Sequence, residues 1–243
     1  TPIQNKILLD GMTIYNPFHS IGFFSIFETE LVQNTSIFTG GFDAEYGGRI
    51  SSIMDITYRD GNKKKFSGKV SASPFIAKAV LEGPLGSIKK NNTIGSYVIS
   101  AKHSLIDKTS PLLYKKINRD DTLNRGMPFS FTDLYGKLTL KGKGSSKFSV
   151  FGFHNTDRVN YTQADIKWDQ SGGGLNFVLV PSSSPILVKG HVNGSNFKTR
   201  FNEPIIGSSD TISRFSSIGG FDLGFDFSLF LKNESQLNYG INL

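Results

Sequence analysis

The feature that most limits the fold of this chain is an alternation of apolar and polar residues that runs from Phe66 to the last residue. Successive side chains of a β-strand point to opposite faces, so a period of two predicts strands with one apolar and one polar face. In the clearest stretch, 218–231, the apolar face carries Phe221, Leu223, Phe225, Phe227, Leu229 and Leu231. The opposite face carries Asp222, Gly224, Asp226 and Ser228.

About nine stretches show this pattern and are predicted to be strands. They are 66–73, 77–85, 96–107, 132–142, 147–157, 172–180, 186–199, 218–231 and 236–243. Strands of roughly 9 to 12 residues can cross the apolar layer of a membrane at the tilt that membrane barrels use. In the stretch 77–85, Val80 is a misfit, because it is apolar on the face that carries Lys78 and Glu82.

The predicted connections alternate between short turns and long polar stretches. Three long loops are expected at Asp107–Pro128, Asn155–Ser171 and Glu203–Ser217. The glycine run Gly172–Gly174 is interpreted as a flexible link. Outer-membrane barrels have this asymmetry of short and long connections, and only closed barrels can place strands in lipid. The apolar faces are therefore expected to contact lipid and the polar faces to line a lumen. A soluble β-sandwich also alternates, so periodicity alone does not decide between the two.

Composition excludes several classes of protein. The chain has no cysteine, so disulfides and thiolate metal sites are impossible, and it has no apolar run long enough for a transmembrane helix. Its 21 phenylalanines and 26 glycines fit strands and turns better than helices. The net charge is +7, but the lysines are scattered through predicted turns. We therefore expect solvated turns or contact with anionic lipid head groups, and no nucleic-acid partner.

The region before Phe66 has a different character, dense in glycine and aromatic residues. Gly40-Gly41 and Gly47-Gly48 predict sharp turns, because glycine enters positive-φ conformations without steric cost. Apolar runs of strand length lie between and beyond these turns. The region is predicted to be a small mixed α/β unit with a long loop from Tyr15 to Phe24.

Several ordered motifs in this region resemble the second half of the plug domain of a TonB-dependent outer-membrane receptor, closest to those of Bacteroidetes-type bacteria. The motifs are Leu8-Leu9-Asp10-Gly11, Ile14-Tyr15-Asn16-Pro17-x-His19, Gly22-Phe23-Phe24-Ser25, Gly40-Gly41-Phe42-x-Ala44-x-Tyr46-Gly47-Gly48-Arg49-x-Ser51-Ser52 and Asp60-Gly61-Asn62. The resemblance implies a multi-pass barrel in a Gram-negative outer membrane. It assigns 1–62 to the plug and 63–243 to the first part of the barrel. Because a lumen that holds a plug needs roughly 22 strands, we expect the chain to be a segment of a longer polypeptide.

The resemblance also implies a function. It predicts uptake of a scarce ligand, an iron chelate, peptide, cofactor or glycan, energised by TonB and its inner-membrane complex. The ligand-binding residues that it implies at the plug apex are Tyr15, Asn16, Phe18, His19, Phe23 and Phe24. Phe23 and Phe24 could instead pack the plug against the barrel. Glu45 and Arg49 resemble charged plug residues that contact the barrel wall, where a confined charge needs a partner.

No arrangement of residues for catalysis is visible, so an enzyme is not expected. The four histidines, His19, His103, His154 and His191, lack the spacing of metal ligands, and no cofactor is predicted. Two other functions stay open at this point. One is a plugged barrel that acts as a scaffold in a surface complex with lipoproteins, and the other is a soluble β-rich binding module.

Overall fold

The computed structural model of the chain describes residues 4–42, 44–48, 50–87, 92–113, 126–142, 144–161, 164–181, 184–205, 210–231 and 235–243. Within this part, the strands form two main sheets and one two-stranded ribbon. The larger sheet contains every strand after Phe66, and the smaller sheet and the ribbon lie in residues 4–62, which we call the N-terminal unit.

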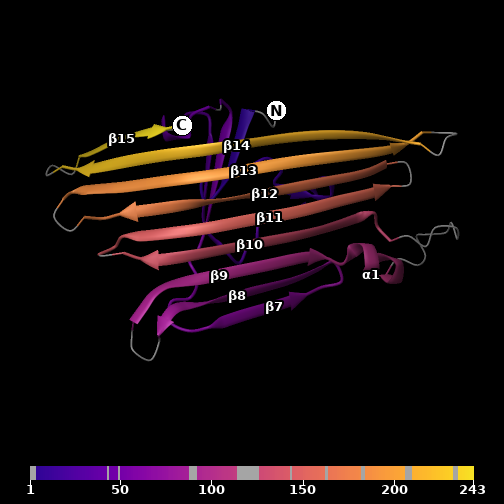
Figure 1. The fold of residues 1–243 in the computed structure, drawn as a ribbon, viewed down its shortest axis with the longest axis horizontal. Helices are drawn as coiled ribbons and strands as arrows, with labels where there is room; N and C mark the ends of the chain where they lie inside the picture. Colours follow the sequence, from indigo (N-terminus) through magenta and orange to yellow (C-terminus); the bar gives the residue numbers. More distant parts are fainter. Residues whose placement is uncertain are drawn as a thin grey trace.

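The larger sheet has nine strands in sequential order, each antiparallel to its neighbours (Figure 1). They are β7 (Ser67–Ala72), β8 (Ile76–Ser87), β9 (Asn92–Ser104), β10 (Phe129–Lys141), β11 (Lys147–Tyr161), β12 (Ala164–Leu179), β13 (Ile186–Pro204), β14 (Thr211–Phe230) and β15 (Gln236–Asn242). The N-terminal unit, indigo to purple in Figure 1, lies behind this sheet. The nine predicted strands are confirmed, and each connects directly to the next.

The apolar faces predicted from the sequence point away from the N-terminal unit and are exposed. Phe221 is 68% exposed and Phe225 41%. The same face of the other strands carries further exposed apolar side chains: Val70, Leu81, Ile99, Leu134, Leu138, Leu140, Phe148, Val150, Leu175, Leu179, Leu237 and Ile241. An exposed apolar surface this continuous marks contact with a membrane or a partner, whereas a sandwich would bury it.

Two of the three predicted long loops are strands. β11 continues to Tyr161 and β12 begins at Ala164, while β13 continues to Pro204 and β14 begins at Thr211. The predictions for Asn155–Ser171 and Glu203–Ser217 were therefore wrong. Beyond the apolar band, the outward positions of these strands are also polar, as at Arg158, Lys167 and Lys198. Because both faces are polar there, the sequence shows no alternation even though the backbone stays paired.

The third predicted loop begins with a helix. The segment Ile106–Leu113 forms α1, although it contains Pro111, and part of the rest of the predicted loop lies outside the described residues. The Leu105 carbonyl accepts the N–H groups of Lys108 and Thr109, which starts the first turn. No helix in the described part is long and apolar enough to span a membrane.

The N-terminal unit is built around a four-stranded mixed sheet with the order β2-β1-β6-β5, in which β1 and β6 are parallel. Its elements are β1 (Asn5–Leu9), β2 (Met12–Ile14), β3 (Phe18–His19), η2 (Ser20–Gly22), β4 (Phe24–Ser25), β5 (Val32–Thr39), η3 (Ala44–Tyr46) and β6 (Ser52–Tyr58). Its described residues include two short 3-10 turns, η2 and η3.

The hairpin of β1 and β2 turns at Asp10-Gly11. Both residues have positive φ, 50° for Asp10 and 85° for Gly11. Two-residue hairpin turns of this type favour Asp-Gly, because both central residues must enter left-handed conformations. The turn projects Asp10 toward the larger sheet, where a methyl group at Gly11 would lie 2.9 Å from Nδ2 of Asn193.

The hydrophobic core lies between the N-terminal unit and the inner face of the larger sheet. The unit contributes Leu9, Met12, Ile14, Ile26, Leu31, Ile56 and Tyr58, and the sheet contributes Val80, Val98, Tyr135, Phe151 and Phe153. This explains Val80, the misfit of the sequence pattern, because the unit covers it to 5% exposure. The apolar side chains of β8 to β11 on the inner face are thus part of a core that the sheet shares with the unit.

The glycine run 172–174 is part of β12 and not a flexible link, so that interpretation was wrong. A methyl group at Gly172 would lie 2.3 Å from Sδ of Met12, and one at Gly174 would lie 1.8 Å from Oδ1 of Asn193. Glycine is required at these two positions because the N-terminal unit and β13 approach β12 closely there.

The exposed apolar face predicts that a charged residue introduced on the outer face of β14 destabilises the barrel more than one introduced on its inner face. Phe225→Arg in the full-length protein should destabilise the barrel in phospholipid vesicles by about 2–4 kcal/mol, because it places a cation on the lipid face. Ser228→Arg, on the inner face of the same strand, should cost far less. Equilibrium unfolding in urea measures both, and equal losses would contradict the orientation of the sheet.

Candidate functional site

Polar and charged contacts join the N-terminal unit to the inner face of the larger sheet. They form three groups, centred on Asp10, on His19, and on the acidic residues Glu28 and Glu30. Each group pairs a side chain of the unit with side chains from strands β7 to β11. These contacts determine how firmly the unit is held.

The first group surrounds Asp10, which is 5% exposed. Its carboxylate accepts hydrogen bonds from the Tyr135 hydroxyl and from Lys137 Nζ at 2.9 Å. Lys137 Nζ also donates to the Tyr58 carbonyl at 2.7 Å, and the Tyr58 N–H donates to Asp10 at 3.2 Å. Asn176 Nδ2 donates to the Asp10 carbonyl at 2.7 Å. The turn residue thus connects β1, β6, β10 and β12.

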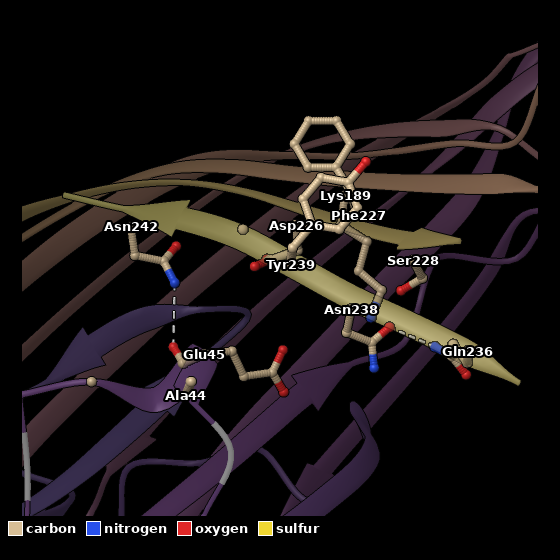
Figure 2. A pocket seen from close by; sticks show the side chains of 12 residues that line it. Ala44, Glu45, Lys189, Asp226, Phe227, Ser228, Gln236, Asn238, Tyr239 and Asn242 are labelled. Carbon is tan, nitrogen blue, oxygen red and sulfur yellow. Dashed lines mark hydrogen bonds between the residues drawn. The ribbon is translucent and has the colours of Figure 1, made fainter. Parts of the chain in front are cut away.

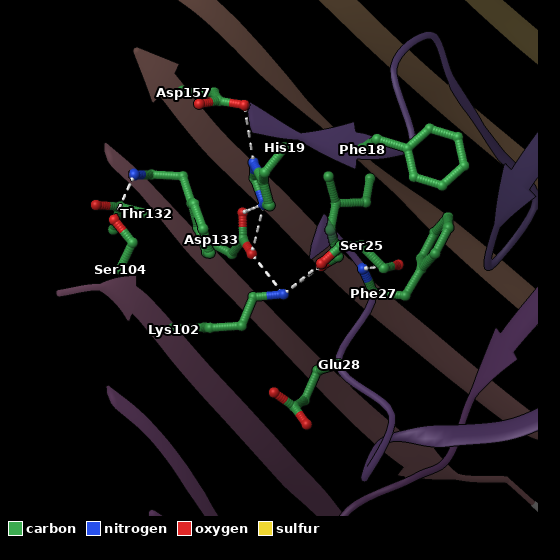
Figure 3. Close-up of polar contacts among 12 residues, drawn as sticks. Phe18, His19, Ser25, Phe27, Glu28, Lys102, Ser104, Thr132, Asp133 and Asp157 are labelled. Carbon is green, nitrogen blue, oxygen red and sulfur yellow. Dashed lines mark hydrogen bonds and ion pairs between the residues drawn. The ribbon is translucent and has the colours of Figure 1, made fainter. Parts of the chain in front are cut away.

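The second group surrounds His19, whose side chain is fully buried (Figure 3). Nε2 lies 2.8 Å from Asp133 Oδ1, and Nδ1 lies 3.4 Å from Asp157 Oδ2. The ring stacks on Phe131 with centroids 4.1 Å apart and an interplanar angle of 5°. Lys102 Nζ lies 2.8 Å from Asp133 Oδ2 and 2.8 Å from the Ser25 carbonyl.

The charges of this group balance only when His19 is protonated. Asp133 and Asp157 then carry two negative charges against the positive charges of Lys102 and His19. Burial alone would lower the pKa of His19, but hydrogen bonds and charge from Asp133 and Asp157 outweigh burial and raise the pKa. An uncompensated charge in a buried site is costly, so the proton on His19 holds the group together.

The third group joins the N-terminal unit to strands β7 and β8, at the first edge of the sheet. Lys78 contacts Glu28 at 2.8 Å and Glu30 at 3.0 Å, and Lys69 contacts Glu30 at 3.2 Å. Beside this group, the Arg59 guanidinium forms a bidentate salt bridge with the Glu82 carboxylate, with N–O distances of 2.5 and 3.2 Å. Such paired contacts fix orientation as well as distance.

The predicted ligand-binding residues fall into two sets. Phe18 and Phe23 are 52% and 73% exposed, and Phe23 meets Phe129 edge-on at 5.8 Å. Tyr15 and Asn16 are half-buried, and both of their N–H groups donate to Gln170 Oε1, at 3.0 and 3.1 Å. These backbone contacts anchor the loop on β12.

The other set packs against the sheet. Phe24 is half-buried beside Phe131, with ring centroids 5.5 Å apart. His19 was predicted to face a ligand, but the structure buries it between two strand carboxylates. The sequence showed a polar residue in a long loop and gave no sign of its distant partners, Asp133 and Asp157.

The loop and the sheet border an open cavity of about 260 Å³. It is lined by Asn16, Phe18, Ile21, Gly22, Asp157 and Trp168. Asn16 and Phe18 belong to the predicted ligand-binding set, while Asp157 and Trp168 come from β11 and β12 and were not predicted. The two strand residues are direct cross-strand partners.

The predicted pair Glu45 and Arg49 is described only in part, because Arg49 lies outside the described residues. The Glu45 carbonyl accepts a hydrogen bond from Asn242 Nδ2 of β15 at 3.3 Å. Glu45 also lines a cleft of about 650 Å³ between η3 and strands β13 to β15, together with Lys189 and Asp226 (Figure 2). Glu45 therefore lies where the unit meets the far edge of the sheet.

Sequence reasoning missed most of the residues that join the unit to the sheet. A signal was present: lysines 69, 78, 102 and 137 fall on the polar faces of successive predicted strands, while the N-terminal unit carries Asp10, Glu28 and Glu30. A basic inner face opposite an acidic unit predicts ion pairs between them. In the described part of the chain, no group of three His, Cys, Asp or Glu side chains is placed to hold a metal ion.

Comparison with known proteins supports the fold. No family model and no curated protein sequence matches the chain. The hemophore receptor HasR of Serratia marcescens, solved as a double mutant with its hemophore HasA and heme, has a TM-score of 0.67 at 12% identity. The match covers 98% of this chain and 36% of that one.

Two further solved structures give the same result. A mutant of the ferric enterobactin receptor PfeA of Pseudomonas aeruginosa has a TM-score of 0.61 at 13% identity, over 99% of this chain and 41% of its own. The iron transporter FrpB of Neisseria meningitidis has a TM-score of 0.63 at 15% sequence identity. The match covers 99% of this chain and 39% of that one. The chain spans between 36% and 41% of the length of these structures. Its fold is that of an antiparallel β-barrel wall with the small N-terminal unit against its inner face.

The His19 group predicts that the docking of the N-terminal unit weakens at alkaline pH. The raised pKa means that the stabilisation is complete below the pKa of about 6.5 of a free histidine. It is lost as the pH rises through the raised pKa of the folded state. Hydrogen–deuterium exchange of the Ser20 N–H, which donates to Asp157, measures this loss in the full-length protein. At alkaline pH its rate should rise more steeply than the intrinsic exchange rate of an unprotected amide.

Two variants make this test specific. His19→Gln should remove the alkaline step, because glutamine does not titrate. His103→Gln should keep it, because His103 lies on the outer face and bonds to Thr132. The same alkaline step in His19→Gln would rule out His19 as its source.

The Asp10 group predicts a large effect of breaking one buried ion pair. Lys137→Met should weaken docking of the N-terminal unit by about 3–5 kcal/mol, since it leaves the Asp10 carboxylate buried without a cation. The double variant Asp10→Asn/Lys137→Met should recover much of the loss. The urea dependence of hydrogen–deuterium exchange at the Tyr58 N–H measures docking of the N-terminal unit. If Lys137→Met protected this N–H as well as the double variant does, the Asp10–Lys137 ion pair would not hold the unit.

Proposed function

We propose that the chain is part of a TonB-dependent outer-membrane receptor of a Gram-negative bacterium, which imports a scarce ligand through a plugged barrel. Residues 1–62 are the second half of the plug, and 63–243 are the first part of the barrel. The observation that carries this proposal is the combination of an exposed apolar band outside and an ion-paired unit docked inside. The fold shared with receptors for hemophore-bound heme and ferric enterobactin supports it.

The two faces of the larger sheet suit this role. Strands in lipid must satisfy all backbone groups within a closed sheet and present apolar side chains outward. The inner face is polar, and the N-terminal unit packs against it through buried charges. Such a unit blocks the lumen at rest, because its core is shared with the wall.

Import requires that the plug moves without the barrel unfolding. The contacts described above are separable ion pairs and hydrogen bonds around a modest apolar core. The barrel carries no energy source, so force from an inner-membrane complex acting through TonB supplies the work. Because buried ion pairs gain little net energy over their hydration, exchange of their partners for water limits the work needed.

The ligand meets the plug at the loop that follows β2. Tyr15, Asn16, Phe18 and Phe23 are the loop residues that we assign to ligand contact, and His19 and Phe24 hold the loop on the wall. Aromatic side chains offer stacking faces, and half-buried amide groups offer hydrogen bonds, the mixture found in ligand sites. The cargo belongs to the broad class of iron chelates, peptides, cofactors or glycans.

Uptake by cells tests this function. Strains with and without the full-length gene, and a strain lacking TonB, are supplied with a mixture of ferric chelates, haem, peptides and oligosaccharides, and depletion of each compound is followed by mass spectrometry. At least one compound should disappear only when both the gene and TonB are present. The proposal would be overturned if the compound were also depleted by the strain lacking TonB. It would be overturned as well if the strains with and without the gene depleted every compound equally.

The loop assignment is tested with the compound so identified. Phe18→Ala/Phe23→Ala should lower its affinity roughly tenfold, because two exposed stacking faces are removed. Leu134→Ala, an outward position on β10, serves as the control and should leave affinity unchanged. Equal affinities in the two variants would remove the loop from the ligand site.

A further inference from the structure

The outer face of the larger sheet carries a row of three cations beyond the apolar band. Arg158 of β11 lies directly opposite Lys167 of β12, and Lys167 lies directly opposite Arg200 of β13. The register between these strands is unbroken as far as the outward residues Val150 and Leu175, so all three cations point outward. They belong to the strand ends at the right of Figure 1, on the face turned away from the N-terminal unit.

This row places like charges where neighbouring strands normally avoid them. Directly opposed side chains have Cβ atoms roughly 5 Å apart, and like charges at that distance destabilise the pair of strands. Lys167 is opposed by a cation on each side. Two carboxylates offset part of the charge, because Arg158 Nε lies 2.7 Å from Asp165 Oδ1 and Lys167 Nζ lies 3.3 Å from Asp169 Oδ2.

A fourth cation, Lys198, lies at the next outward position of β13, opposite Asp169. Lys198 and Arg200 are both exposed, and neither makes an ion pair or a hydrogen bond within the described part of the chain. We call Arg158, Lys167, Lys198 and Arg200 the cationic patch. With Asp165 and Asp169 included, the patch keeps an excess of positive charge on accessible side chains, so it attracts an anionic group from outside the described chain.

The cationic patch stands at the height of lipid headgroups. Phe148 is the outward residue beside the short turn that precedes β11, and Arg158 lies ten residues further along this strand. At about 3.4 Å per residue and a tilt of about 40°, this separation spans roughly 26 Å of membrane. The apolar band of membrane barrels is about 25 Å tall, so the cations lie just beyond its far edge.

The patch lies at the same end of the barrel wall as the loop that follows β2. Asp157, which His19 of this loop contacts, directly precedes Arg158 in the chain. In the orientation of the proposed function, this end faces the outside of the cell. The lipid that meets the patch therefore belongs to the outer leaflet of the membrane.

We propose that the cationic patch binds the phosphate group of an outer-leaflet lipid. Guanidinium groups such as those of Arg158 and Arg200 match phosphate oxygens in a bidentate manner, and lysines add positive charge at the membrane surface. A lipid fits this face because the same strands continue into the apolar band, which receives its acyl chains. The proposal goes beyond import and depends on the proposed function only for the orientation of the sheet in the membrane.

Native mass spectrometry of the full-length receptor in a neutral detergent tests the proposal with two probes. They are diphosphoryl lipid A and the same lipid without its phosphates. The diphosphoryl form should bind at least roughly tenfold more tightly. Lys198→Gln/Arg200→Gln should weaken its binding roughly thirtyfold, because two cations at the headgroup are lost, and should leave binding of the phosphate-free lipid unchanged.

The matched control removes the same charge from the inner face of β13 and β14. Lys189 lies opposite Asp226, and Arg214 contacts Glu203 at 3.7 Å, so Lys189→Gln/Arg214→Gln should bind diphosphoryl lipid A as the wild type does. Equal losses in the two double variants would overturn the proposal, because net charge alone would then explain the attraction. Equal affinities of the wild type for the two lipids would also overturn it and leave an acidic protein as the partner.

Competition with inorganic phosphate separates a lipid site from a site for a soluble anion. Millimolar phosphate should not displace diphosphoryl lipid A, because the acyl chains also bind to the apolar band. Complete displacement would overturn the assignment to a lipid.

Thermal unfolding of Lys167→Gln distinguishes lipid binding from a structural role of the patch. In neutral detergent without anionic lipid, this variant should unfold at a higher temperature than the wild type, because two like-charge oppositions are removed. Diphosphoryl lipid A should then raise the unfolding temperature of the wild type more than that of the variant. A variant that is less stable than the wild type in both conditions would show that the cations hold the sheet, and would overturn the proposal.

These measurements fail independently of the proposed function. A receptor that depletes its cargo in a TonB-dependent manner but binds both lipids equally overturns the lipid site alone. A receptor that prefers the diphosphoryl lipid but depletes no compound overturns import and leaves the lipid site in place.

Discussion

Every charge buried between the N-terminal unit and the sheet needs a partner of opposite sign, and the rest of the arrangement depends on this requirement. The inner face of the sheet presents Lys78, Lys102 and Lys137 on neighbouring strands, and the unit supplies Asp10 and Glu28 to meet two of them. Lys102 is met by Asp133 of the next strand, which in turn holds His19. The apolar band of the outer face has no such need, because its side chains are uncharged and exposed. One sheet therefore serves two environments.

The Asp10-Gly11 turn shows how a short motif serves both local and distant structure. Its positive φ angles close the hairpin of β1 and β2, and its carboxylate reaches Tyr135 and Lys137 across the interface. The loop after β2 is held in the same way, by Gln170 through two N–H groups and by Asp133 and Asp157 through His19.

The sequence was sufficient to predict which residues face out and which face in, because alternation follows directly from strand geometry. It failed for the ends of β11 to β14, where polar surroundings on both faces remove the alternation while backbone pairing continues. It placed His19 at a ligand surface because the partners of His19 lie more than a hundred positions away in the chain. Ion pairs across such separations depend on which strands become neighbours, and residue patterns within one strand do not contain that information. Trp168, in the wall of the cavity, was missed because its segment was interpreted as a loop.

The central claim is that β7 to β15 stand in lipid with their apolar face outward and the N-terminal unit docked on the other side. Spin labels at Val150, Leu175 and Ile99, compared with one at Asn238, test it most directly in the full-length protein reconstituted in vesicles. The three outward labels should relax rapidly with oxygen and be shielded from a water-soluble nickel chelate, whereas the label at Asn238 should be shielded from oxygen. Outward labels that are accessible to the nickel chelate, or buried from both reagents, would contradict the account.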